Sequence, residues 1–149
     1  MSENLYGSRP DLLPAFMATA KKRDVLGVEV LTAEENHALE ERSLNRFAHL
    51  SSGRIRWEGV PVVTTSFRDE DHGVQVLGER LLEVLGEETD LVIFWGTLVM
   101  PTVSMSSAVA LGHLNEIVQE APDFWIFLPS RMALVEFMQD GIVTTAEVS

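Results

Sequence analysis

The chain contains no cysteine, which excludes disulfide bonds, thiolate metal sites and a cysteine nucleophile. It also lacks a long apolar run. The longest run, residues 91–100, is interrupted by Gly96 and Thr97, and it is shorter than the roughly 18 residues that a membrane-spanning helix needs. No basic stretch followed by an apolar one marks a secretory signal at the amino terminus. These absences predict a cytoplasmic protein of bacterial type, whose fold is held together by packing alone.

Basic residues are scarce in the second half of the sequence. The 149 residues carry a formal net charge of −12. Residues 1–68 contain nine acidic and nine basic side chains, whereas residues 69–149 contain fourteen acidic and only two basic ones. Such a surface repels a nucleic acid backbone and attracts a basic protein partner. The alternative is that the acidic side chains only keep the protein soluble.

The hydrophobic pattern predicts alternating strands and helices. Strands are expected at residues 25–31, 60–66, 91–95, 124–128 and 142–148, with an optional edge strand at 54–58. Helices are expected at 32–50, after a Thr32–Glu35 capping box, and at 69–85, 106–119 and 131–139. This order predicts an α/β fold, an open doubly wound, flavodoxin-like sheet of three layers with five mostly parallel strands. Residues 1–149 are expected to form one domain, with residues 1–24 as a short N-terminal helical appendage.

Polar side chains follow several of the predicted strands. In an open parallel sheet the carboxyl ends of the strands meet at one edge, where ligands bind against helix amino termini. The ligand-binding set expected at that edge is Arg68, Thr97, Ser104, Ser106, Ser107, Ser130 and Arg131. A phosphate or a carboxylate would fit these groups. The alternative is that the serines only cap helices and that Arg131 pairs with a surface carboxylate.

Sequence motifs for common enzyme chemistry are absent. There is no glycine-rich dinucleotide motif, no Walker lysine motif, no nucleophile elbow and no zinc-protease motif. The sequence therefore predicts no catalytic residue, no cofactor and no metal site. One basic patch is expected from Arg42, Arg46, Arg54 and Arg56. This patch could bind a phosphate, a partner's carboxylates or the acidic half of a second copy in a homodimer, or it could be a solvated stripe.

Residues 74–112 resemble the nucleoside 2-deoxyribosyltransferase-like family. The resemblance rests on three segments: the helix at 75–83, the Asp90-led strand through residue 95, and the helix that opens with small and hydroxyl residues at 104–112. It implies a flavodoxin-like sheet and a nucleoside-like ligand. In that family a glutamate in the last helix attacks the sugar, and at the matching position this sequence has Ala110.

Two functions remain open on the sequence alone. The first is a non-catalytic acidic binding protein, such as an immunity or inhibitor protein that neutralises a basic toxin or enzyme. Its expected partner-binding residues are acidic and cluster in and near one helix: Asp69, Glu70, Asp71, Glu79, Glu83 and Glu87. The alternative is a nucleoside- or nucleotide-binding domain, a degenerate relative of glycosyl-transfer or N-glycosidase enzymes, with its pocket at the carboxyl edge of the sheet. The missing catalytic residues favour the first function.

Overall fold

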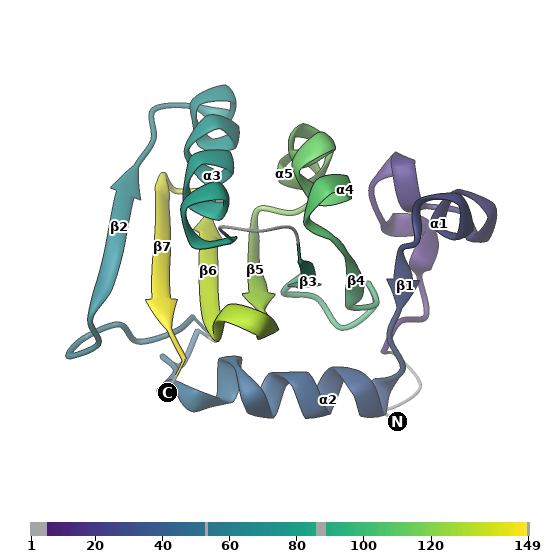
Figure 1. The fold of residues 1–149 in the computed structure, drawn as a ribbon. Helices are drawn as coiled ribbons and strands as arrows, with labels where there is room; N and C mark the ends of the chain where they lie inside the picture. The colour runs from purple at the N-terminus through teal and green to yellow at the C-terminus, as the bar shows by residue number, and fades with distance from the viewer. Residues whose placement is uncertain (1–5, 53, 86–88, 149) are drawn as a thin grey trace.

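A computed structural model describes residues 6–52, 54–85 and 89–148 and contains a single sheet of seven strands (Figure 1). The strands are β1 (Glu29–Val30), β2 (Val62–Ser66), β3 (Asp90–Phe94), β4 (Val103–Ser106), β5 (Asp123–Leu128), β6 (Ala133–Met138) and β7 (Ile142–Glu147). The α-helices are α1 (Ala20–Leu26), α2 (Ala33–Arg42), α3 (Glu70–Leu85), α4 (Ser107–Gly112) and α5 (Leu114–Glu120). Short 3-10 turns occur at Pro10–Leu12, Ala15–Met17, Leu44–Arg46 and Pro129–Arg131.

The strands run in the order β1-β4-β3-β5-β6-β7-β2, and each described neighbouring pair is antiparallel. The prediction of a mostly parallel, five-stranded, flavodoxin-like sheet is therefore wrong. Two errors produced it. Residues 131–139 were expected to be a helix but contain β6, and no strand was expected between residues 95 and 106, where β4 lies. Because residues 133–138 form a strand, β5, β6 and β7 make consecutive antiparallel hairpins, and no α-helical crossover links them.

The residues of β6 contain good helix formers, yet all six are buried. Burial on both faces of the sheet removes the polar alternation by which an exposed strand is recognised. The residues on either side of β6 have features that indicate a strand between two turns. Met132 has a left-handed backbone, with φ 46°, and the turn after β6 contains Asp140 and Gly141, with Gly141 at φ 116°. An Asp-Gly pair between apolar runs is a strong hairpin signal.

The predicted capping box at the start of α2 is confirmed. The Thr32 hydroxyl accepts a hydrogen bond from the Glu35 amide at 3.1 Å, and the Glu35 carboxylate accepts one from the Thr32 amide at 2.9 Å. The helix ends at Arg42, however, and does not continue to residue 50. The segment 54–58 contributes only one isolated bridge, between Ile55 and His49.

Three other expected elements have different bounds. The strand expected at 25–31 is reduced to β1, because α1 continues to Leu26 and ends at Gly27 in the left-handed region, with φ 73°. The helix expected at 106–119 is broken at His113 into α4 and α5. By contrast, α3 matches its predicted range closely, and its buried residues recur with helical spacing.

Two hydrophobic cores lie on opposite faces of the sheet. Alternate residues of β3 show this division: Leu91 and Ile93 join the core under α3, α4 and α5, whereas Val92 and Phe94 join the core under α2. Figure 1 shows α3, α4 and α5 on one side of the molecule and α2 on the other. Leu13, Phe16 and Met17 also belong to the first core, where Met17 is fully buried. The face under α2 positions the site described next.

Candidate functional site

The predicted ligand-binding residues are only partly brought together. Ser107 accepts a hydrogen bond from the Thr89 amide at 3.2 Å, and the Thr89 hydroxyl lies 2.8 Å from that of Ser130. The neighbouring Arg131 donates its Nε to the Leu85 carbonyl at the end of α3, at 2.9 Å. These contacts tie the end of α3 to the β5–β6 connection.

The other members of the set lie apart. Ser106 caps α4 by accepting from the Val109 amide at 3.2 Å, and Ser104 lies within β4. Three hollows in the surface contain one member each: Thr97 lines the first, Arg131 the second and Arg68 the third. The expected edge depended on parallel strands ending together, and the antiparallel sheet has no such edge. The seven residues therefore do not line a common pocket in these three hollows.

The acidic residues expected to bind a partner lie mostly on the solvent side of α3. Asp69, Glu70, Asp71, Glu79 and Glu83 are all exposed, whereas Glu87 lies outside the described residues. Some also have local structural roles. The Asp69 carboxylate accepts from the His72 amide at 2.9 Å, and Glu83 forms an ion pair with Arg80. The exposed face of α3 is thus an acidic surface that faces away from α2.

The four arginines of the expected basic patch have separate contacts. The guanidinium of Arg42 lies 5.7 Å from the centre of the Phe127 ring, and Arg46 donates to the Glu41 carbonyl at 3.1 Å. Arg54 lies 3.2 Å from Asp140 and 3.8 Å from Asp123, and Arg56 lies 3.8 Å from Glu58. Each positive charge therefore has its own nearby partner.

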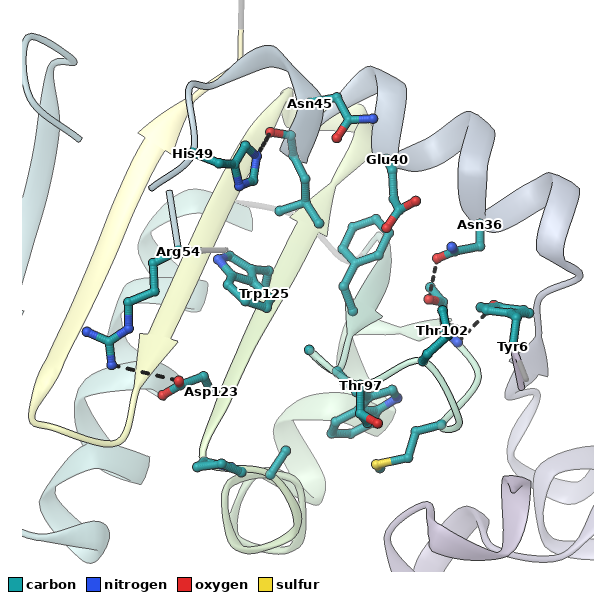
Figure 2. A pocket seen from close by; sticks show the side chains of 18 of the residues that line it. Tyr6, Asn36, Glu40, Asn45, His49, Arg54, Thr97, Thr102, Asp123 and Trp125 are labelled. Atoms are coloured by element: carbon teal, nitrogen blue, oxygen red, sulfur yellow. Dashed lines mark hydrogen bonds and ion pairs between the residues drawn. The ribbon is translucent and has the colours of Figure 1, made fainter. Parts of the chain in front are cut away.

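The first hollow is a groove of about 690 Å³ on the α2 side of the sheet, and we call it the α2 groove (Figure 2). Its lining comes from four separate parts of the chain: Tyr6; α2 and the turn after it; the segment 94–102; and the segment 120–125. Arg54 and Ser52 complete it. Phe94 and Trp125 from the sheet provide aromatic surface, and three carboxylates line the groove together with the Arg54 guanidinium: Glu40, Glu120 and Asp123.

Glu40 projects from α2 toward the sheet, as Figure 2 shows. The residue is partly buried, and burial raises the pKa of its carboxyl group, while the charge of His37 and a hydrogen bond from Asn36 act in the opposite direction. Arg54 lies within 3.8 Å of two carboxylates, whereas no described basic side chain forms such an ion pair with Glu40. A partly buried carboxylate without a cationic partner is thus present in the groove.

One end of the groove is held by a hydrogen-bonded cluster. The Tyr6 hydroxyl accepts from the Thr102 amide at 3.0 Å and donates to the Leu31 carbonyl at 3.2 Å. The Thr102 hydroxyl donates to the Asn36 side chain, which links the loop before β4 to α2. Burial raises the pKa of Tyr6, so this phenol stays protonated and continues to donate at neutral pH.

The sheet beneath the groove contains a buried carboxylate held by two indoles. Glu136 of β6 is 4% exposed. Its two oxygens accept hydrogen bonds from Trp57 Nε1 at 2.8 Å and from Trp125 Nε1 at 2.9 Å. This pair of bonds fixes the Trp125 ring and fastens the segment around Trp57 to the sheet. The groove therefore has a rigid aromatic floor with negative charge behind it.

The described residues were compared with the requirements of a metal site and of a membrane-spanning helix. Within residues 6–52, 54–85 and 89–148, no group of three or more His, Asp or Glu side chains is placed to hold a metal ion. The same residues include no helix long and apolar enough to cross a membrane. What the groove offers is charge, aromatic surface and shape, which are properties of a binding surface.

Sequence reasoning missed the α2 groove. Its acidic residues, Glu40, Glu120 and Asp123, are far apart in sequence, and no motif relates them. The available clue was Glu40 itself. It follows the Thr32 capping box by two helical turns, on the same side of the helix as Asn36, a placement that the capping box makes predictable.

Comparison with known proteins identifies one family. A family model described as "CdiI immunity protein EcoliA0-like" matches residues 24–146. None of the curated proteins compared with the chain matches it. The match overturns the resemblance of residues 74–112 to the nucleoside 2-deoxyribosyltransferase-like family. Ala110, which stood at the position of that family's glutamate, is a fully buried core residue of α4.

Proposed function

The chain belongs to the CdiI immunity protein family, and we propose that it protects the cell that makes it by binding a contact-dependent toxin and blocking the toxin's action. An immunity protein acts by binding, so this function needs neither a catalytic residue nor a cofactor. The observation that carries the proposal is the family match, which spans residues 24–146.

We further propose that the toxin is a basic protein. The excess of acidic over basic residues lies entirely in residues 69–149, and the exposed face of α3 carries part of it. A surface of one sign raises the rate at which an oppositely charged partner arrives. Asp69, Glu70, Asp71, Glu79 and Glu83 are the residues we propose for this long-range attraction. Because they are exposed, their effect should weaken as salt is added.

A nucleoside or nucleotide ligand is not part of the proposal. The seven residues that suggested it do not share any of the three hollows described above. The family match also replaces the resemblance from which that ligand was inferred.

The test uses the toxin domain encoded by the gene next to the one for this chain. Cells that produce this toxin domain are grown with and without the chain, and the two purified proteins are then mixed to measure their affinity. We expect the chain to restore growth and to bind the toxin domain, with an association rate that falls between 50 and 500 mM salt, roughly the range over which the screening length shortens severalfold. Full toxicity in the presence of folded, abundant chain would refute the proposed function.

A further inference from the structure

We propose that the α2 groove is the anchoring site of the toxin, and that it takes an arginine or lysine side chain of that protein between Glu40 and the face of Trp125. This inference rests on the proposed function and adds the place and chemistry of contact. It assigns different roles to the two acidic surfaces. The acidic residues of α3 lie on the other side of the sheet and add only to the long-range negative field of the protein, whereas the groove holds the partner.

The lining of the groove matches a cation in both charge and surface. Three carboxylates and one guanidinium line it, and that guanidinium, on Arg54, is already engaged by Asp123 and Asp140. Glu40 and Glu120 are not members of any ion pair between described residues. Trp125 adds the aromatic face on which a guanidinium or ammonium group binds favourably.

The chain itself already binds guanidinium groups in this region. Arg42, from the same helix as Glu40, lies over the ring of Phe127 at 5.7 Å. Phe127 is two residues from Trp125 in β5 and therefore on the same face of the sheet. Arg54 meets the carboxylates at the other side of the groove. A partner's cation over Trp125 would lie between the Arg42 guanidinium over Phe127 and the Arg54 guanidinium beside Asp123.

Glu40 costs the unbound protein stability, because its carboxylate is partly removed from water without a cation beside it. Residues that bind are often kept at such a cost to stability. A partner's cation would reverse this cost, since the desolvated carboxylate would then lie beside an opposite charge. The same substitution should therefore favour folding of the free protein and weaken the complex.

The experiment compares three variants of the full chain with the wild type, using the toxin domain encoded by the neighbouring gene as the probe. Glu40→Gln and the double variant Glu40→Gln/Glu120→Gln change the groove. Glu34→Gln is the matched control, because Glu34 is exposed on the same helix and does not line the groove. Association and dissociation rates are measured separately by surface plasmon resonance, and thermal unfolding of each free variant is recorded.

We expect Glu40→Gln to raise the dissociation rate about tenfold and the double variant to raise it further, with association changed less than threefold. A desolvated charge pair acts mainly on dissociation, whereas an exposed charge acts mainly on association. The control should stay within twofold of the wild type in both rates. If the folded double variant dissociates within twofold of the wild type, the toxin does not anchor in the groove. That result would leave the proposed function intact, whereas absence of wild-type binding would refute the function itself.

Discussion

Replacing Glu136 with glutamine tests the buried link between β6 and two tryptophans. The substitution keeps the size and shape of the side chain but removes one acceptor oxygen. In the native protein each carboxylate oxygen accepts from one indole, at 2.8 Å from Trp57 and 2.9 Å from Trp125. The glutamine amide can accept from only one of them, because its NH₂ group turns donors toward the other.

The expected loss follows from the hydrogen bonds. A hydrogen bond to a charged group contributes about 1.5–3 kcal/mol, and a buried donor left without an acceptor costs about 1–3 kcal/mol. Removing the buried charge recovers part of this, because Glu136 is only 4% exposed and its desolvation was unfavourable. We therefore expect the free energy of unfolding to fall by about 2–3 kcal/mol. For a domain of this size that lowers Tm by roughly 4–12 °C.

Urea unfolding, followed by far-UV circular dichroism and by tryptophan fluorescence, measures the change. Glu147→Gln at the exposed end of β7 is the matched control and should change stability by less than about 0.5 kcal/mol. The variant Trp57→Phe and its combination with Glu136→Gln complete a double-mutant cycle. If Glu136→Gln is as stable as Glu147→Gln, or if the cycle shows no coupling, the carboxylate does not hold the two indoles and the reasoning fails.

Three further predictions concern the helices and the β6–β7 turn. The pKa of Glu40 is raised in the folded state, so the wild type should lose stability as pH rises above about 4.5, the ordinary value for this group. Glu40→Gln should lack this loss, and a pH series of urea titrations in which the two proteins run parallel would contradict it. Thr32→Ala removes the cap of α2 and should cost about 1 kcal/mol in thermal unfolding, with Ser51→Ala in an exposed turn as control. Gly141→Ala should cost about 1–3 kcal/mol, because φ is 116° there and a Cβ would lie 3.1 Å from the Phe67 carbonyl oxygen. An unchanged midpoint in either of these last two variants would show that the cap or the turn is not under the constraint described.

Local features of the fold could be predicted because short-range chemistry determines them. The Thr32–Glu35 capping box and the buried spacing of α3 are properties of a few neighbouring residues, and both are present as expected. The direction of the strands could not be predicted in this way. The strand direction depends on β6, which is buried on both faces and therefore shows no polar alternation. Its one charged residue, Glu136, is buried because the indoles of Trp57 and Trp125 donate hydrogen bonds to it.

The candidate site shows the same limit. The acidic character of the surface could be counted directly from the sequence, and it led to the expectation of a protein partner. The groove could not be found in this way, because Tyr6, Glu40 and Asp123 meet only when the sheet is assembled in its observed order. The set expected around Arg131 failed for a related reason, since it assumed that parallel strand ends share one edge.

The position of β2 has a consequence for how the protein is made. This strand pairs with β7 over residues 62–66 and 142–146, so 76 to 84 positions separate the paired residues. During synthesis on the ribosome β2 has no described neighbour in the sheet until β7 has been translated and has left the exit tunnel. A nascent chain therefore carries β2 unpaired while the residues between the two strands are made, and this edge of the sheet forms only after β7 emerges.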